Sequence, residues 1–223
     1  MTPESANSAD PAARKRGRPR DPGVEGRRRA EILAAAGRVF AAAGYAATDV
    51  QAIAAAAGVG KGTVYRYFKR KDDLFLAAVD HGLTDLAATC SAAVGDTAVP
   101  VLARLAGVCR AYLAFFAARP EMVELFVQER ATFRGRRQAL YFAVDESDPR
   151  HCGMTTFMGE LFASGVLRPF TPDQFHEVVG DLLFGTVVAN TLSGRPADPD
   201  AQAQAVVHLL FHGILARSPE PTA

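Results

Sequence analysis

The sequence contains no tryptophan, only three cysteines and no long uninterrupted run of apolar residues. Cys90, Cys109 and Cys152 are odd in number and lack Cys-x-x-Cys spacing, which argues against a disulfide framework or a zinc site. No apolar segment reaches the roughly 18 residues that span a bilayer, and the N-terminus is polar and basic rather than a secretory signal. These absences predict a cytoplasmic protein with no membrane partner.

Motifs for catalysis are also missing. The sequence has no nucleophile elbow, no His-Glu-x-x-His helix and no pair of carboxylates with a spacing typical of acid–base catalysis. We therefore expect a protein that is not an enzyme, with no catalytic residue, no metal site and no cofactor. The pair His151-Cys152 could belong to a metal or redox sensor, although a buried thiol beside a polar histidine is the more ordinary interpretation.

Alanine-rich segments with apolar residues at helical spacing dominate the chain, which predicts an all-α protein. At 223 residues the chain is long enough for one or two domains. Residues 1–72 contain 14 Lys and Arg against 7 Asp and Glu, whereas residues 73–223 contain 11 against 17. A basic N-terminal third followed by an acidic remainder is typical of a nucleic-acid-binding domain joined to a regulatory domain.

The segment from Thr48 to Lys71 predicts a helix, a tight turn and a second helix. Thr48 is the expected N-cap of a short helix with one apolar face, Val50–Ala57. Gly58 is the expected left-handed residue at its C-terminal end, and Lys61–Phe68 form the second helix. Small alanines at the crossing let the two helices approach closely, as a helix-turn-helix requires.

Residues 58–75, GVGKGTVYRYFKRKDDLF, resemble the recognition-helix signature of TetR/AcrR-type transcriptional regulators, which runs Gly-Val-Ser, Lys-Gly-Thr, Tyr-x-Tyr/His-Phe. The close match extends from Arg27 to Val79, and Gly60 replaces the usual N-cap serine. The resemblance implies an N-terminal three-helix DNA-binding domain and a C-terminal helical ligand-binding and dimerisation domain. It also implies a homodimer that regulates transcription, acting as a repressor that a small-molecule effector releases from a palindromic operator in double-stranded DNA.

A P-loop nucleotide-binding enzyme is the alternative interpretation of GVGKGT. That motif needs a glycine five residues before the Gly-Lys pair, and Ser or Thr directly after the lysine. Ala55 occupies the first position and Gly62 follows Lys61. The preceding residues also have a helical period, whereas a P-loop follows a buried strand. The helix-turn-helix interpretation is therefore favoured.

Residues 1–22 are rich in Pro, Ala, Ser and charge, so we expect a disordered basic arm. Around Arg16 and Arg18 the sequence Arg-Gly-Arg-Pro is similar to an AT-hook, whose arginines enter the narrow minor groove of A·T-rich DNA. A generic basic tail that only attracts phosphates is the alternative. A third class of protein, a non-specific architectural protein that binds DNA by charge and AT-hook alone, would share this arm.

We expect a DNA-binding domain at residues 23–71, which begins with a helix at Glu25–Ala43, and an effector-binding and dimerisation domain at residues 72–223. In the second domain Asp148-Pro149 should open a helix that Gly165 closes. Two heavily apolar final helices should follow, and homodimerisation through them is favoured over an ordinary core pair. The predicted interface comprises Asp173–Leu192 and Pro199–Ala216.

By resemblance, the candidate DNA contacts lie on and beside the second helix of the motif. Thr48, Tyr67 and Lys71 are the candidate phosphate contacts, and Thr63 and Arg66 the candidates for base edges. The remaining candidates are Lys61, Gly62 and Tyr65, although Tyr65 could instead pack beneath the recognition helix.

Aromatic and histidine side chains of the second domain could line an apolar effector pocket, or they could form ordinary core. The candidate pocket residues are Phe115, Phe126, Phe133, Tyr141, His151, Phe157 and Phe184. The sequence does not identify the effector.

Overall fold

The computed structural model describes residues 22–134, 152–167, 170–195 and 198–214. Within these ranges the chain forms nine α-helices and no β-strand, which confirms the all-α prediction. The helices are α1 (Pro22–Ala43), α2 (Val50–Ala56), α3 (Lys61–Tyr67), α4 (Lys71–Ala93), α5 (Val101–Ala118), α6 (Glu121–Thr132), α7 (Cys152–Ala163), α8 (Pro172–Ser193) and α9 (Pro199–Ile214).

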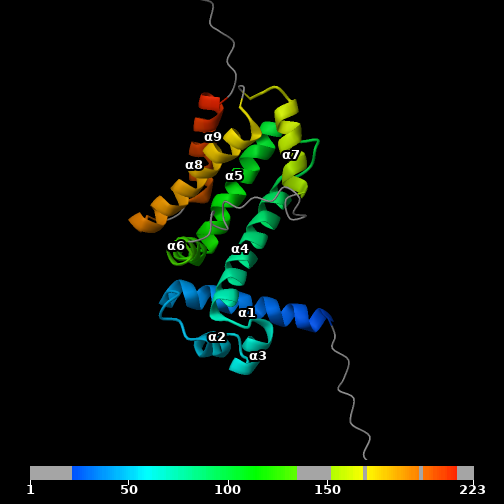
Figure 1. Ribbon diagram of the computed structural model, residues 1–223. Coiled ribbons are helices and arrows are strands. Elements are labelled where there is room, and N and C mark those ends of the chain that lie inside the picture. Colours follow the sequence, from blue (N-terminus) through cyan, green and yellow to red (C-terminus); the bar gives the residue numbers. More distant parts are fainter. Residues whose placement is uncertain (1–21, 135–151, 168–169, 196–197, 215–223) are drawn as a thin grey trace, which may run out of the picture.

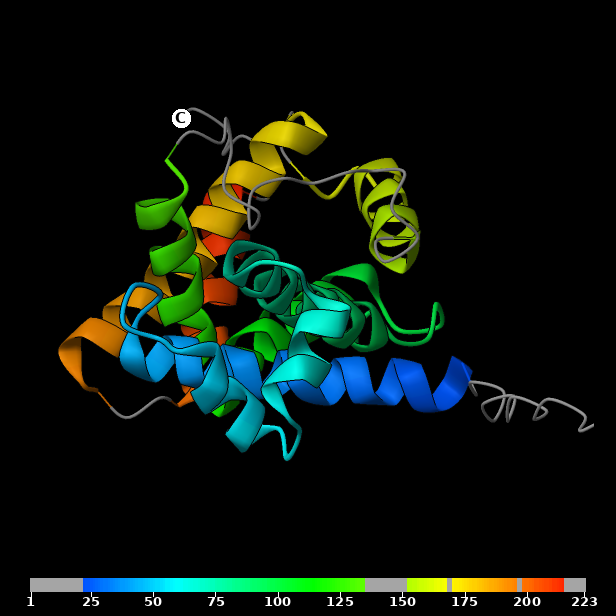
Figure 2. The same cartoon turned by 60° about the horizontal axis from the view of Figure 1, so that its bottom comes forward.

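The first three helices form a small bundle, here called the head, at one end of the molecule (Figure 1). α2 and α3 lie on the side of α1 that faces away from the other helices, and turning this end forward shows both at the surface (Figure 2). α4 runs from the head into the second group, α5–α9. The arrangement confirms an N-terminal helix-turn-helix unit followed by a helical domain.

α1 begins three residues earlier than predicted, at Pro22 rather than Glu25. Proline is tolerated in the first turn because the amides there have no helical partner. The predicted buried face is present, since Ile32, Leu33 and Phe40 are at most 2% exposed. These side chains pack against α4, so that the first half of α4 completes the core of the head.

α6 lies across both α1 and α4, and the absence of a side chain at Gly82 makes room for it. A Cβ atom at Gly37 of α1 would lie 3.5 Å from Leu125, and one at Gly82 of α4 would lie 2.0 Å from the terminal carbon of Met122. Gly82 therefore leaves the space that Met122 fills. The head rests on α6 as well as on α4, and the predicted boundary after residue 71 falls at the start of an unbroken helix.

Contrary to the expectation from the sequence, α5 is long and apolar enough, by length and composition, to cross a membrane. The helix packs against α4, α8 and α9 and buries seven of its side chains in the core. The core helix of a helical bundle passes the same test of length and composition. The contacts of α5 with α4, α8 and α9 are those of a core helix.

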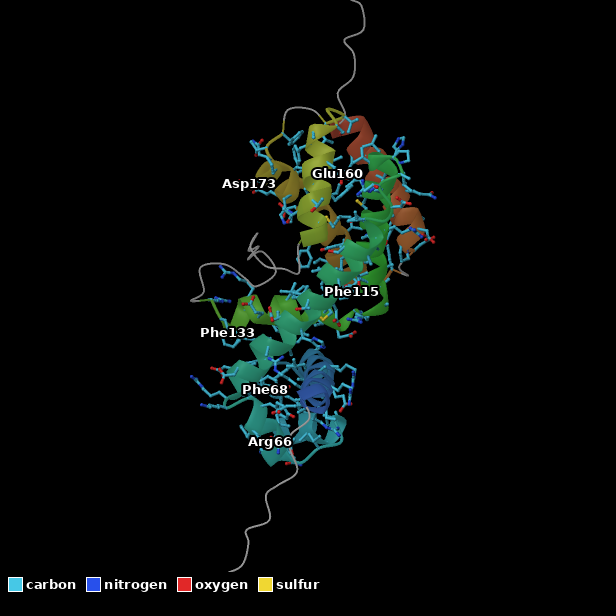
Figure 3. All side chains as sticks on the ribbon, turned by 90° about the vertical axis from the view of Figure 1, so that its right-hand side faces the viewer. Arg66, Phe68, Phe115, Phe133, Glu160 and Asp173 are labelled. Atoms are coloured by element: carbon cyan, nitrogen blue, oxygen red, sulfur yellow. The ribbon has the colours of Figure 1, made fainter. Side chains whose placement is uncertain are left out.

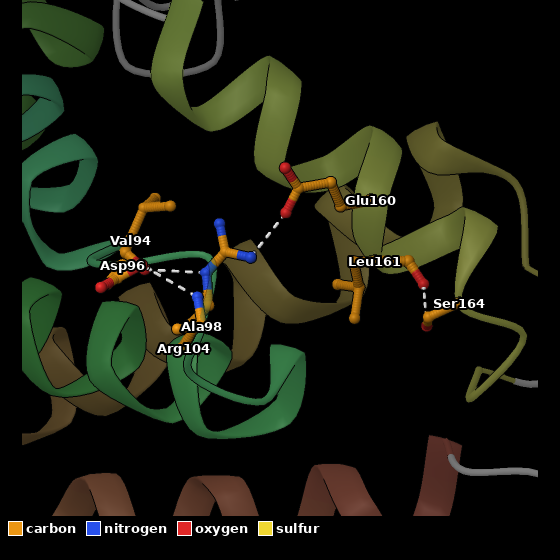
Figure 4. A network of polar contacts seen from close by, with 7 residues as sticks. All are labelled: Val94, Asp96, Ala98, Arg104, Glu160, Leu161 and Ser164. Carbon is orange, nitrogen blue, oxygen red and sulfur yellow. Dashed lines mark hydrogen bonds and ion pairs between the residues drawn. The ribbon is translucent and has the colours of Figure 1, made fainter.

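A buried arginine joins α4, α5 and α7 (Figure 4). Arg104 is 6% exposed, its Nε donates a hydrogen bond to the carbonyl of Val94 (3.0 Å), and its Nη1 donates to the carboxylate of Glu160. Its guanidinium also lies 5.0 Å from the ring centroid of Phe157. A buried cation requires such partners, so the network fixes α7 against α5.

The final helices follow local rules closely. The hydroxyl of Thr171 accepts the amide of Gln174, and the Gln174 side chain accepts the amide of Thr171, a capping box with Pro172 as the first helical residue. Gly194, with φ +61°, ends α8. Asp148 and Pro149 lie outside the described residues, and α7 begins at Cys152.

Candidate nucleic-acid interface

α2 begins at Val50, and its N-cap is Asp49 rather than the predicted Thr48. The Asp49 carboxylate accepts the amide of Gln51 (2.8 Å) and pairs with Nζ of Lys61 (3.3 Å). Thr48 is 4% exposed, and its hydroxyl donates to the carbonyl of Gly44 (2.7 Å) at the end of α1. The predicted cap at Thr48 is therefore wrong, since the Asp49 side chain caps α2.

The turn between α2 and α3 is a Schellman motif, as the glycine predicted. Gly58 has φ +65°, its amide donates to Ala55 (3.1 Å), and the amide of Val59 donates to Ala54 (2.9 Å). Gly60 is the N-cap of α3 and offers no side-chain hydrogen bond. The GVGKGT segment thus connects two helices, so the P-loop interpretation, which needs a preceding strand, is wrong.

α3 presents most of its side chains outward. Val64 is fully buried and Phe68, directly after the helix, is 5% exposed, so these two anchor α3 on the head. Arg66 lies at the tip of the molecule (Figure 3). Tyr65 is 43% exposed, which argues against packing beneath the helix. The other candidates are half-buried or exposed: Lys61, Gly62, Thr63 and Tyr67.

Further cations flank α3. The guanidinium of Arg29, in α1, lies 5.3 Å from the ring centroid of Phe68. Lys69 and Arg70 are exposed immediately after α3, beside Lys71, and neither was predicted as a contact. The signal that could have found both is the basic run that follows the recognition helix. Arg70 pairs with Asp72 (3.1 Å), so Arg29 and Lys69 are the cations that extend the positive charge around α3.

Lys71 is held by the loop between α1 and α2. Its Nζ donates to the carbonyl of Ala46 (3.1 Å) and lies 4.8 Å from the ring centroid of Tyr45. Tyr45 in turn donates its hydroxyl to Asp72, and burial, followed by this hydrogen bond, raises the Tyr45 pKa to about 12. The pKa of Asp49 is lowered, first by the amide of Gln51 and then by Lys61. At neutral pH the phenol therefore stays protonated and the carboxylate ionised.

The candidate pocket residues separate in space. Phe126 and Phe184 are 6.4 Å apart and both pack on Phe116, as does Phe115. Phe133 packs elsewhere, 5.5 Å from Tyr45 and 5.7 Å from Phe75. Phe157 lies under Arg104. Figure 3 shows Phe133 closer to the head than Phe115. Tyr141 and His151 lie outside the described residues.

An open cleft of about 500 Å³ lies between α5 and α9, away from those aromatic residues. Small side chains line it, and Arg110 and Asp200 at its edge are 4.0 Å apart. In the described part of the chain no group of three or more His, Cys, Asp or Glu could hold a metal ion. Burial raises the pKa of the Cys90 thiol to about 12 and of the Cys109 thiol to about 11, so neither is a reactive thiolate at neutral pH.

Comparison with a protein-family model places sequence similarity in the head and the first part of α4. A family model described as "Bacterial regulatory proteins, tetR family" matches residues 32–78. The chain is 50% identical over 44 residues to the uncharacterised HTH-type transcriptional regulator YhgD of Bacillus subtilis, and 38% identical over 78 residues to the HTH-type transcriptional regulator BetI of Brucella anthropi. These matches cover 20% and 35% of this chain, and only 23% and 40% of the two relatives.

Solved structures extend the similarity to the whole fold. A TetR-family regulator from Marinobacter aquaeolei superposes with a TM-score of 0.68 at 16% identity, covering 88% of this chain and 100% of that one. FadR from Bacillus subtilis, in complex with stearoyl-CoA, gives a TM-score of 0.64 at 19% identity, covering 82% and 98%. At these identities the similarity is one of architecture.

Proposed function

We propose that this chain, a member of the TetR family of bacterial regulatory proteins, is a sequence-specific DNA-binding transcriptional regulator and not an enzyme. The outward face of α3 carries the proposal: a short helix, anchored by Val64 and Phe68, that exposes polar and basic side chains beside further cations. A helix presented in this way fits the major groove of B-DNA.

In the proposed complex, side chains of α3 read the bases and flanking groups bind phosphates. Thr63 and Arg66 contact base edges, and an arginine can bind guanine O6 and N7 with two hydrogen bonds. Tyr67 and Lys71, together with Lys61, bind phosphates and set the register. Thr48 is left out, because its side chain is buried and its hydroxyl is engaged.

The protein would act as a homodimer formed through α8 and α9. Exposed apolar side chains on these helices support this proposal: Val178 is 46%, Leu209 58% and Leu192 82% exposed. A second copy related by a two-fold axis would cover them and place two heads about one turn of DNA apart or somewhat more. The operator would then be a short palindrome.

The arm that contains Arg16 and Arg18 would add minor-groove contacts. Both residues lie outside the described part of the chain, so this proposal rests on the sequence alone. Removal of residues 1–21 should weaken DNA binding and reduce its salt dependence, which titrations at several salt concentrations would measure. Unchanged affinity in the truncated protein would contradict a role for the arm.

A small apolar molecule would release this cytoplasmic regulator, as a repressor, from DNA. The packed rings of Phe115, Phe116, Phe126 and Phe184 form an apolar region of the helical domain, and we place the effector site there. FadR of Bacillus subtilis, which has the same architecture, is described in complex with stearoyl-CoA. A ligand acts in this way only if it binds one arrangement of the two heads more tightly than the other.

Capture of genomic fragments tests the proposed function. Purified protein is mixed with sheared DNA of its source genome, and the bound fragments are sequenced. Enrichment of a few discrete sites is the expected result. Uniform recovery, or recovery of A·T-rich fragments without discrete sites, would contradict it and favour the architectural alternative.

A further inference from the structure

One helix of the regulatory domain touches the head directly. α6 packs on α1, and the side-chain oxygen of Gln128 accepts the backbone amide of Tyr45 (2.9 Å) in the loop between α1 and α2. The two residues are 83 positions apart in the sequence. This contact is independent of α4, the helix that connects the two parts of the chain.

The ring of Tyr45 makes a second contact with the same end of α6. It packs edge-on against Phe133, which directly follows α6, and against Phe75 of α4, with centroid distances of 5.5 and 5.1 Å. Phe133 and Phe75 also stack on each other, 5.7 Å apart. Figure 3 shows Phe133 at the level where the head meets the other helices. The backbone and the ring of Tyr45 are thus both fixed by α6.

The other side of Tyr45 faces the first turn of α4. Its hydroxyl donates to Asp72, and Nζ of Lys71 lies over its ring while donating to the carbonyl of Ala46, the next residue. An ammonium group has three donors, so the bond to Ala46 leaves donors for a phosphate oxygen. The position of the Lys71 amine therefore depends on a loop that α6 holds.

We propose that Tyr45 is a positioning residue that transmits the position of α6 to the DNA-binding surface. While Gln128 and Phe133 hold Tyr45, the Lys71 amine is held at the surface beside α3. A shift of α6 releases the loop, and Lys71 loses both its carbonyl acceptor and the ring beneath it. DNA affinity then falls for all sequences, because Lys71 binds phosphate. The inference rests on the proposed function and names the residue that regulates it.

Hydrogen exchange of the full-length free protein tests the contact between α6 and the loop without DNA. Gln128→Met keeps the length of the side chain but removes the acceptor, and Gln128→Glu keeps an acceptor. Val127→Ala is the control, because Val127 is next to Gln128 in the sequence and its side chain is 52% exposed. We expect amide exchange at Tyr45 and residues 46–49 to be about fivefold faster in Gln128→Met only. A change of about fivefold corresponds to the free energy of one net hydrogen bond. Exchange at the wild-type rate in Gln128→Met would overturn the proposal.

A double-mutant cycle then tests the link to DNA. Gln128→Met should weaken binding to a selected operator about threefold to fivefold, and should have almost no further effect in a Lys71→Ala background. Equal losses in both backgrounds would overturn the role of Tyr45 in placing Lys71. If the wild-type protein prefers no operator over random DNA, the proposed function itself fails, and the exchange experiment still decides whether Gln128 holds the loop.

Discussion

Arg66 and Lys71 should contribute to binding in different ways, because one faces outward from α3 and the other is held at its flank. Arg66→Ala should remove about 1–3 kcal/mol of discrimination at one base pair of each half-site. Lys71→Ala should weaken all sequences alike and lower the salt slope by about 1. Competition between operator and random duplexes measures both effects. Equal losses on the two kinds of DNA for Arg66→Ala would contradict a base contact.

The ion pair between buried Arg104 and half-buried Glu160 should matter for stability rather than for DNA binding. Glu160→Ala leaves the buried guanidinium without its carboxylate and should lower the free energy of unfolding by about 1–3 kcal/mol. Denaturant unfolding measures this loss. Glu124→Ala, at an exposed position on α6 outside the proposed dimer interface, is the matched control and should change little. An unchanged midpoint for Glu160→Ala would contradict a structural role for the network.

Single residues show how far local rules reach. Gly58 was predicted as the left-handed residue because few other residues tolerate that backbone conformation. Thr48 was predicted as the cap of α2, but the neighbouring Asp49 takes that position. Aspartate is preferred over threonine at N-caps, so the observed cap agrees with cap preference. The Thr48 hydroxyl instead donates to the Gly44 carbonyl, a contact that the sequence did not predict.

At the scale of elements, the α4–α6 crossing has a specific steric requirement. Gly82→Ala would place a methyl group in the space of the Met122 side chain, and we expect it to be about 1 kcal/mol less stable than a Gly→Ala change at an open helical position, which gains the same helix propensity. Gly159→Ala is the control, because a Cβ atom there meets nothing within 4 Å. Thermal unfolding of both variants compares them. An equal change of stability in Gly82→Ala and Gly159→Ala would contradict the steric requirement and show that Met122 moves aside.

Helix positions were predictable where the ends carry caps. The segment Thr171-Pro172 located the start of α8, and its predicted end at Leu192 is one residue short of the observed Ser193. The membrane criterion was misjudged for α5, whose two arginines interrupt the apolar pattern although its composition as a whole is apolar. The burial of Arg104 could not be predicted, because its carboxylate partner Glu160 lies 56 residues away in the sequence.

For the molecule as a whole, dimerisation is the prediction with the largest consequence. Leu209→Asp places a charge on an apolar side chain that is 58% exposed, and should turn a dimer into a monomer. Operator affinity should fall at least about tenfold, because a monomer binds one half-site and loses the gain in affinity that two linked heads provide. Analytical ultracentrifugation and DNA titration measure the two effects.

Val99→Asp is the matched control, at a comparably exposed apolar residue between α4 and α5, and should remain dimeric. A dimeric Leu209→Asp variant would favour the alternative in which α8 and α9 form only an ordinary core pair.

The effector site was the least predictable feature. The sequence predicted that the aromatic residues of the second domain line one pocket. In the structure Phe133 packs at the junction with the head, and Phe157 lies beneath Arg104. Only the residues around Phe116 came together. Helical period shows which face of a helix is buried, but not which buried faces meet. The DNA-binding surface was easier to predict because one contiguous segment forms it.

The most direct test of the account is the selection of bound sequences from a random duplex pool by the purified full-length protein at moderate salt. We predict enrichment of a single palindrome whose half-sites are about one helical turn apart or slightly more. Enrichment of A·T-rich DNA without symmetry, or no enrichment, would contradict a dimeric, sequence-specific regulator.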